Sequence, residues 1–94
     1  MLTLDITEVS FVRASAEQQR GGLEGWARVV IGGSIRIDRL ALRRTLAGEL
    51  RVFFPEHVDR AGIRHALVWV VSAKERAEFE SRILQEIRAR GGLS

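Results

Sequence analysis

The feature that most constrains the fold is an amphipathic segment near the end of the chain, residues 72–90. Ser72 begins the pattern S-A-K-E of a capping box, in which a serine and a glutamate three residues later satisfy free backbone amides at the start of a helix. Gly91-Gly92 supplies the glycine that commonly ends one. Apolar side chains repeat every four residues and form one stripe: Phe79, Ile83 and Ile87. An amphipathic helix buries its apolar face against another apolar surface, so the rest of the chain must provide that surface.

The residues before this helix have the period of β-strands. Apolar and polar residues alternate from Leu2 to Thr7, and the phase then slips, which predicts a bulge near Thr7–Glu8. Residues 15–22 are polar with two glycines, so they are expected to form an exposed loop. Alternation resumes over residues 23–31 and is followed by Gly32-Gly33, a two-residue hairpin signal between apolar runs.

A third strand is predicted from Ser34, with a second slip of phase that indicates a bulge at Asp38–Arg39. A fourth strand, LRVFF, stops at the only proline, Pro55, and a loop follows. Residues 63–71 include ALVWVV, which is apolar on both faces and predicts a strand covered on both sides.

The order of elements predicts an α+β fold, with an antiparallel sheet of four to five strands followed by one long C-terminal helix. Ninety-four residues are expected to form one domain, residues 1–94. No apolar run approaches the roughly 20 residues that span a bilayer, so no membrane association is expected. The chain has no cysteine, which excludes disulfides and thiolate zinc sites, and its N-terminus lacks a basic leader. A cytoplasmic protein is the default expectation.

The positive charge of the chain is concentrated in one segment. The chain has a net charge of +3, and fourteen of its fifteen basic residues are arginines. Five of these arginines lie in residues 36–51 against Asp38 and Glu49, so this segment alone carries +3. Clustered arginine favours contacts with nucleic-acid phosphates, although a charged rim on an ordinary domain is the alternative interpretation. The candidate contacts are the arginines of this segment and of the following loop: Arg39, Arg43, Arg44, Arg60 and Arg64.

No constellation of catalytic residues is evident. His57 and His65 are eight residues apart with no third ligand in a metal-binding pattern, so a structural role is expected for both and no metal site is predicted. Asp38 and Asp59 are isolated carboxylates, for which roles in a bulge or turn are expected. The glycine pairs form no phosphate-binding loop. Neither an enzymatic activity nor a cofactor is expected.

The two tryptophans leave two interpretations open. Trp26 and Trp69 could stack on bases, as aromatic residues do on sheet-built platforms. Packing in an interface is the preferred interpretation for both, since Trp69 lies within ALVWVV. Val68, Trp69 and Val70 are therefore the predicted dimer interface. The final helix alternates basic and acidic residues four apart, which pair with one another on its surface. It is therefore expected to cover the sheet as a structural element rather than to enter a groove of nucleic acid.

With these elements placed, the chain resembles the stage V sporulation protein G family, the septation regulators of bacteria. The resemblance covers nearly the whole chain and rests on ITEVSFVR, ARVVIGGSIRIDRLAL, LRVFFP, the arginine of AGIRHAL and the serine-capped helix. It implies a homodimer built by strand pairing and a regulator that binds DNA and, in some members, RNA, without a cofactor. After Pro55 the chain has Glu56-His57-Val58-Asp59 where the family carries a serine and a basic pair, so only Arg60 and Arg64 remain as cations of that loop.

The sequence thus predicts a homodimeric α+β protein that binds nucleic acid. The alternative is a structural or protein-interaction module whose arginines only solvate one face of a sheet.

Overall fold

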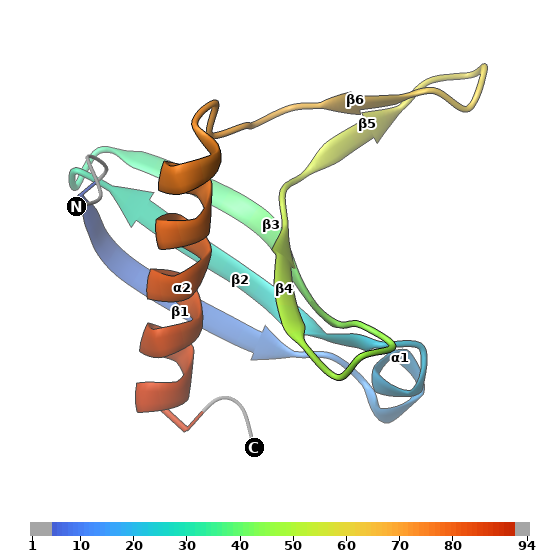
Figure 1. The fold of residues 1–94 in the computed structure, drawn as a ribbon, viewed down its shortest axis with the longest axis horizontal. Helices are drawn as coiled ribbons and strands as arrows, with labels where there is room; N and C mark the ends of the chain where they lie inside the picture. Colours follow the sequence, from blue (N-terminus) through green and yellow to red (C-terminus); the bar gives the residue numbers. More distant parts are fainter. Residues whose placement is uncertain (1–4, 92–94) are drawn as a thin grey trace.

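Four strands form one antiparallel sheet in which neighbours in sequence are also neighbours in space. In the computed structural model, which describes residues 5–91, these strands are β1 (Ile6–Arg13), β2 (Leu23–Ile31), β3 (Ile35–Arg44) and β4 (Leu50–Phe53), in the order β1-β2-β3-β4. A long helix follows and lies across one face of the sheet (Figure 1). The predicted α+β fold is confirmed. The predicted strand positions Leu2 to Leu4 lie outside the described residues.

Both predicted bulges are present. The pairing of β1 with β2 shifts between Ile6 and Glu8, and the pairing of β2 with β3 shifts where Asp38 and Arg39 oppose the single residue Arg28. Arg39 has a φ of 61°, the only non-glycine residue of the described chain with a positive φ. The second bulge turns Leu40 and Leu42 toward the core, where both are completely buried.

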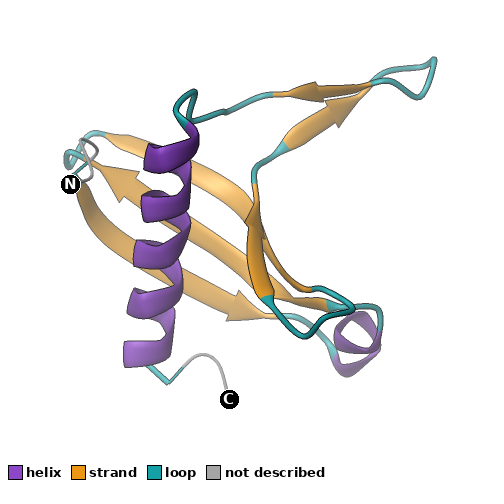
Figure 2. Ribbon diagram, in the orientation of Figure 1, coloured by secondary structure: helices purple, strands orange, loops and turns teal. Residues whose placement is uncertain are grey.

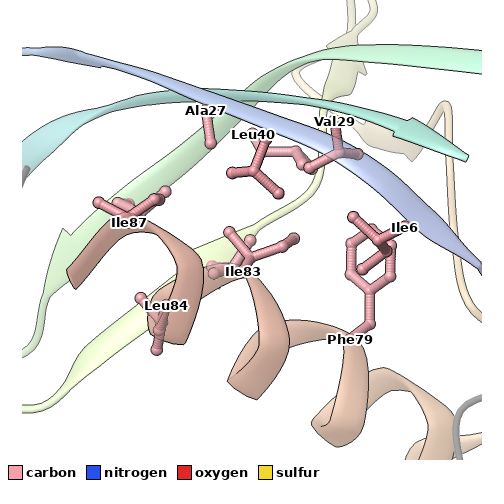
Figure 3. Close-up of a cluster of buried hydrophobic side chains, with 11 residues drawn as sticks. Ile6, Ala27, Val29, Leu40, Phe79, Ile83, Leu84 and Ile87 are labelled. Atoms are coloured by element: carbon pink, nitrogen blue, oxygen red, sulfur yellow. The ribbon is translucent and has the colours of Figure 1, made fainter. Parts of the chain in front are cut away.

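The helix α2 (Ala73–Ala89) begins and covers the sheet as the sequence predicts. The hydroxyl of Ser72 accepts a hydrogen bond from the backbone N–H of Glu75 at 3.3 Å, and Gly91 beyond the helix has a φ of 70°. The helix buries Phe79, Ile83, Leu84 and Ile87 against the inner side chains of the strands (Figure 3). Those strand residues are Ile6, Val9, Ala27, Val29, Leu40, Leu42 and Val52.

Helix α2 and its C-cap residue Arg90 also satisfy backbone groups on both edges of the sheet. The carboxylate of Glu80 accepts a hydrogen bond from the backbone N–H of Val52 on β4 at 2.7 Å. At the opposite edge, the guanidinium of Arg90 donates to the backbone carbonyl of Val9 on β1. An unpaired edge strand invites pairing with another chain, so these side chains protect both edges at these positions.

Between β1 and β2 the predicted loop is wrong in part, because residues 16–20 form a short helix, α1 (Ala16–Arg20). Ser15 and Gln18 make a reciprocal capping box: the backbone N–H of Gln18 donates to the Ser15 hydroxyl and the backbone N–H of Ser15 donates to the Gln18 side chain. None of the five helical residues is buried. Polar capping therefore holds this helix rather than an apolar face.

The next strand, β2, approaches β1 closely at Gly25. A Cβ atom built at Gly25 would lie 2.4 Å from both the ring of Phe11 and the backbone oxygen of Val12. Real Cβ atoms essentially never come this close, so the absence of a side chain lets the Phe11 ring pack over the sheet at this point.

The strand predicted over residues 63–71 is confirmed only for residues 64–66 and is wrong for the rest. Only β6 (Arg64–Ala66) is a strand, and it pairs with β5 (Glu56–Val58) in a separate two-stranded hairpin that projects away from the main sheet (Figure 1). Residues 67–71 have no regular structure and lead back to the helix (Figure 2). The apolar sequence favours a strand, but residues 67–71 pair with no strand among residues 5–91. No described helix is long and apolar enough to cross a membrane.

Candidate nucleic-acid interface

The face of the sheet opposite α2 carries a row of apolar side chains that crosses all four strands. The register places Val12 opposite Trp26, Trp26 opposite Ala41, and Ala41 opposite Phe53. Each of the four has a chain neighbour that is buried in the core or packs against it, so these four point outward. Trp26 is 40% exposed and Phe53 49% exposed. We call Val12, Trp26, Ala41 and Phe53 the outer row.

Two arginines on β3 flank this row. Arg39 precedes Ala41 by two residues and Arg43 follows it by two, so they lie on either side of Ala41 along the strand. Within residues 5–91 no carboxylate lies within ion-pair distance of Arg39 or Arg43. Their positive charges are therefore uncompensated at short range and available to an anion.

A groove of about 800 Å³ runs between the outer face of the sheet and the hairpin. Trp26 and Phe53 line its sheet side together with Arg39 and Arg43, while Arg64 lines it from the hairpin. A second, smaller hollow of about 290 Å³ continues along the face beside Arg39. The two hollows share Trp26 and Arg39, so they form one continuous surface.

The surface has an excess of positive charge. Arg28 donates to the carboxylate of Asp38 at 2.7 Å, and Arg64 pairs with Glu56 at 3.3 Å. Arg39 and Arg43 are the other charged residues that line the two hollows. Four arginines thus face two carboxylates, which leaves a net charge of +2 on the lining.

The structure gathers only some of the predicted contacts. Arg39, Arg43 and Arg64 line the groove. Arg44 does not, because its guanidinium lies 3.6 Å from the carboxylate of Glu24 and donates to a backbone carbonyl at 3.0 Å beside another hollow. Arg60 lies in the turn of the hairpin and is exposed there.

The predicted interface residues lie where the chain returns from the hairpin to α2. The side chain of Trp69 is 56% exposed. Its ring packs edge to face on that of Phe54, with 5.9 Å between the ring centroids. The guanidinium of Arg76 lies over the Trp69 ring, 4.3 Å from its centroid. Val68 is partly buried, and Val70 packs against the core. Other large apolar side chains are exposed along this part of the chain: Val58, Ile63, Leu67 and Val71.

The two isolated carboxylates have the structural roles that the sequence suggests. Asp38 lies in the β3 bulge and pairs with Arg28 and, at 3.3 Å, with Arg36. Asp59 closes the hairpin turn by accepting the backbone N–H groups of Ala61 and Ile63.

The hairpin turn also sets the ionisation of Asp59. Its second oxygen lies 2.8 Å from Nε2 of His65. The hydrogen bond with His65, followed by those from the turn amides, lowers the pKa of Asp59 below its usual value. Among residues 5–91, no group of three His, Cys, Asp or Glu side chains could hold a metal ion.

Sequence reasoning named Trp26 but missed Phe53 and the alignment of the outer row. The signal was present in LRVFF, because a strand that turns Leu50 and Val52 toward the core must turn Phe53 outward. The alignment of Phe53 with Trp26 depends on the registers of β2, β3 and β4, which the sequence leaves open.

Comparison of the chain with protein-family models and with curated proteins gives no match. The resemblance to the septation regulators therefore stays a prediction that rests on the quoted residues.

Proposed function

We propose that this protein binds nucleic acid, DNA or RNA, on the outer face of its sheet and acts as a regulator of the septation-regulator type. The observation that carries the proposal is the pair Arg39 and Arg43, two exposed arginines with no acidic partner in residues 5–91. A guanidinium presents a planar fork of donors that matches phosphate oxygens. Phosphate contacts of this kind supply most of the affinity of nucleic-acid-binding proteins.

The opposite side of the molecule is less suited to this role. Helix α2 mixes both signs of charge, and Arg82 pairs with Glu86 one turn away at 3.4 Å. Arg51 is likewise engaged by Glu80. Their charges are compensated locally, so they attract a phosphate chain less than the outer face does.

We further propose a cytoplasmic homodimer in which a second copy covers Trp69 and its neighbours. Isolated two-stranded hairpins are marginally stable in water, so the projecting β5–β6 hairpin gains from a partner. The exposed side chains of Ile63, Leu67 and Trp69 supply apolar surface for that contact. A dimer would carry two copies of the Arg39–Arg43 pair and so double the positive surface.

The salt dependence of binding tests the proposal. Removing one phosphate-binding cation reduces the slope of log affinity against log salt by about 0.9 on duplex DNA and about 0.7 on single strands. The double variant Arg39→Gly/Arg43→Ala removes four arginines from a dimer, so the slope should fall by about 3.6 or about 2.8, respectively. Glycine suits the positive φ of residue 39, so the variant relieves backbone strain there, and weakened binding is not a result of weakened folding.

A matched control removes the same charge elsewhere. Arg20→Ala/Arg88→Ala takes one exposed arginine from each helix and should leave the slope close to that of the wild type. A slope reduced equally by both double variants would contradict a site on the outer face. The exposed apolar side chains favour a second candidate, a protein-interaction module. A wild-type protein that binds neither DNA nor RNA at low salt would support that candidate and end the nucleic-acid proposal.

A further inference from the structure

The outer row has a geometry suited to flat ligands. Trp26 and Phe53 lie on either side of Ala41, so roughly two strand spacings, about 10 Å, separate them. The methyl group of Ala41 is too small to fill the space between the two rings. Both rings are exposed and both line the same groove. An aromatic face left open in this way can stack on another planar ring.

The charges lie where a phosphate chain would need them. Arg39 and Arg43 are each two residues from Ala41, about 7 Å along the strand, on opposite sides of the row. Arg64 faces the same groove from the hairpin. A strand whose bases stack on the row would therefore have guanidinium groups within reach on both sides.

We propose that the outer face binds single-stranded nucleic acid, with bases stacked on Trp26 and Phe53 and phosphates held by Arg39 and Arg43. This inference rests on the proposed function and names its substrate class. A duplex keeps its base faces stacked internally and offers this surface only phosphates and base edges, which leaves the two rings without a partner. Single strands expose every base face, and stacking on aromatic side chains is tolerant of sequence.

Charge argues against a second copy of this chain as the occupant of the groove. A symmetric contact places the same patch on both partners. The net +2 of one lining would then face the net +2 of the other, with Arg39 and Arg43 near their own counterparts. Like charges placed across an interface are costly. A polyanion removes this cost and fits the surface.

The test compares one strand with its duplex. Anisotropy of a labelled oligothymidylate of about 12 nucleotides, within the range of known stacking sites, is measured beside the matching oligouridylate and the duplex with oligoadenylate. We expect tighter binding to the single strands. Trp26→Ala or Phe53→Ala should weaken single-strand binding about 5- to 150-fold, the range found when a stacking aromatic is replaced by alanine. The salt slope should stay unchanged, because the phosphate contacts remain.

Two further variants guard against a loss of folding. Ile35→Ala removes exposed apolar surface from β3 outside both hollows, and it should bind like the wild type. Trp26→Phe keeps a ring and should recover most of the affinity. In a Trp69→Phe background, Trp26 is the only tryptophan, and stacking should quench its emission when the oligonucleotide is added.

The outcomes separate the two proposals. Salt-sensitive binding that prefers the duplex, or that Trp26→Ala leaves unchanged, overturns the single-strand inference and keeps the proposed function. A shift of Trp26→Ala from dimer to monomer in sedimentation also overturns it, since a second copy would then occupy the face. Binding to no nucleic acid ends both proposals. Preference for single strands together with loss of affinity in both ring variants supports both.

Discussion

Glu80 holds together the helix and the edge of the sheet, and replacing it should measurably destabilise the fold. Its carboxylate accepts the backbone N–H of Val52 at 2.7 Å and lies 3.0 Å from Nε of Arg51. These two interactions are unequal. The hydrogen bond to the Val52 amide is partly buried, whereas the side chain of Arg51 is 54% exposed and can be hydrated.

The expected magnitude follows from this difference. A hydrogen bond to a charged group contributes about 1.5–3 kcal/mol, whereas an exposed ion pair contributes about 0–1 kcal/mol. Glu80→Ala removes both and should lower the free energy of unfolding by about 2–3 kcal/mol. Arg51→Ala removes only the ion pair, which also raises the pKa of Arg51, and should cost less than about 1 kcal/mol. Glu80→Gln keeps an oxygen acceptor for the Val52 amide and should fall between them.

Urea denaturation followed by circular dichroism measures these differences at one protein concentration, since the melting of a dimer depends on concentration. A decrease of about 2 kcal/mol corresponds to a fall in Tm of about 8–16 °C for a domain of this size. Equal effects of Glu80→Ala and Arg51→Ala would refute the reasoning, because the bond to the backbone would then contribute nothing.

Three further predictions concern local structure. Ser72→Ala removes the acceptor for a backbone amide at the start of α2 and should cost about 1 kcal/mol in chemical denaturation; an unchanged midpoint would contradict the role of Ser72 as the cap. Gly25→Ala drives a methyl group into the adjacent strand and should cost about 1–3 kcal/mol or prevent folding, whereas Gly21→Ala, with its nearest contact at 3.5 Å, should change stability by no more than about 1 kcal/mol. The pKa of Asp59 is lowered in the folded state, so its stabilisation of the hairpin is fully present above about pH 4, the unfolded value, and is lost as the pH falls through the folded value. The protection factors of the hairpin amides, which correct the exchange rates for their intrinsic pH dependence, should therefore fall at low pH in the wild type, and Asp59→Asn should flatten this dependence.

Most of the sheet can be predicted from the sequence, because the alternation of apolar and polar residues and its interruptions are local signals. The slips of phase at Thr7–Glu8 and Asp38–Arg39 correctly predict both bulges, and Gly32-Gly33 correctly predicts a turn with φ values of 59° and 69°. Ser72 and the apolar stripe predict α2 for the same reason. Each of these features is encoded within a few residues.

The errors occur where structure depends on distant partners or on polar capping alone. ALVWVV has the composition of a buried strand, but composition does not show whether a segment finds a partner strand, and residues 67–71 pair with none in the described part of the chain. Helix α1 has no apolar face, so periodicity misses it, although Ser15 and Gln18 have the spacing of a capping box. At the site, the charge count points to Arg39 and Arg43, which line the groove. Arg44 differs from these two arginines because it pairs with Glu24. The position of Glu24 beside Arg44 follows only from the strand registers of the folded sheet.

The double capping of the sheet edges has a consequence for the nascent chain. All four strands of the sheet are synthesised before α2. The helix supplies the cover for the apolar face and the side chain that reaches Val52, and its C-cap Arg90 reaches Val9. At about 5–20 residues per second, the interval between the end of β4 and the end of α2 lasts roughly 2–7 s. During this time the ribosome-bound sheet has a bare apolar face and two unprotected edges. Neighbouring nascent chains on one polysome are therefore most prone to associate through this face and these edges. A chaperone that shields the sheet would act in this interval.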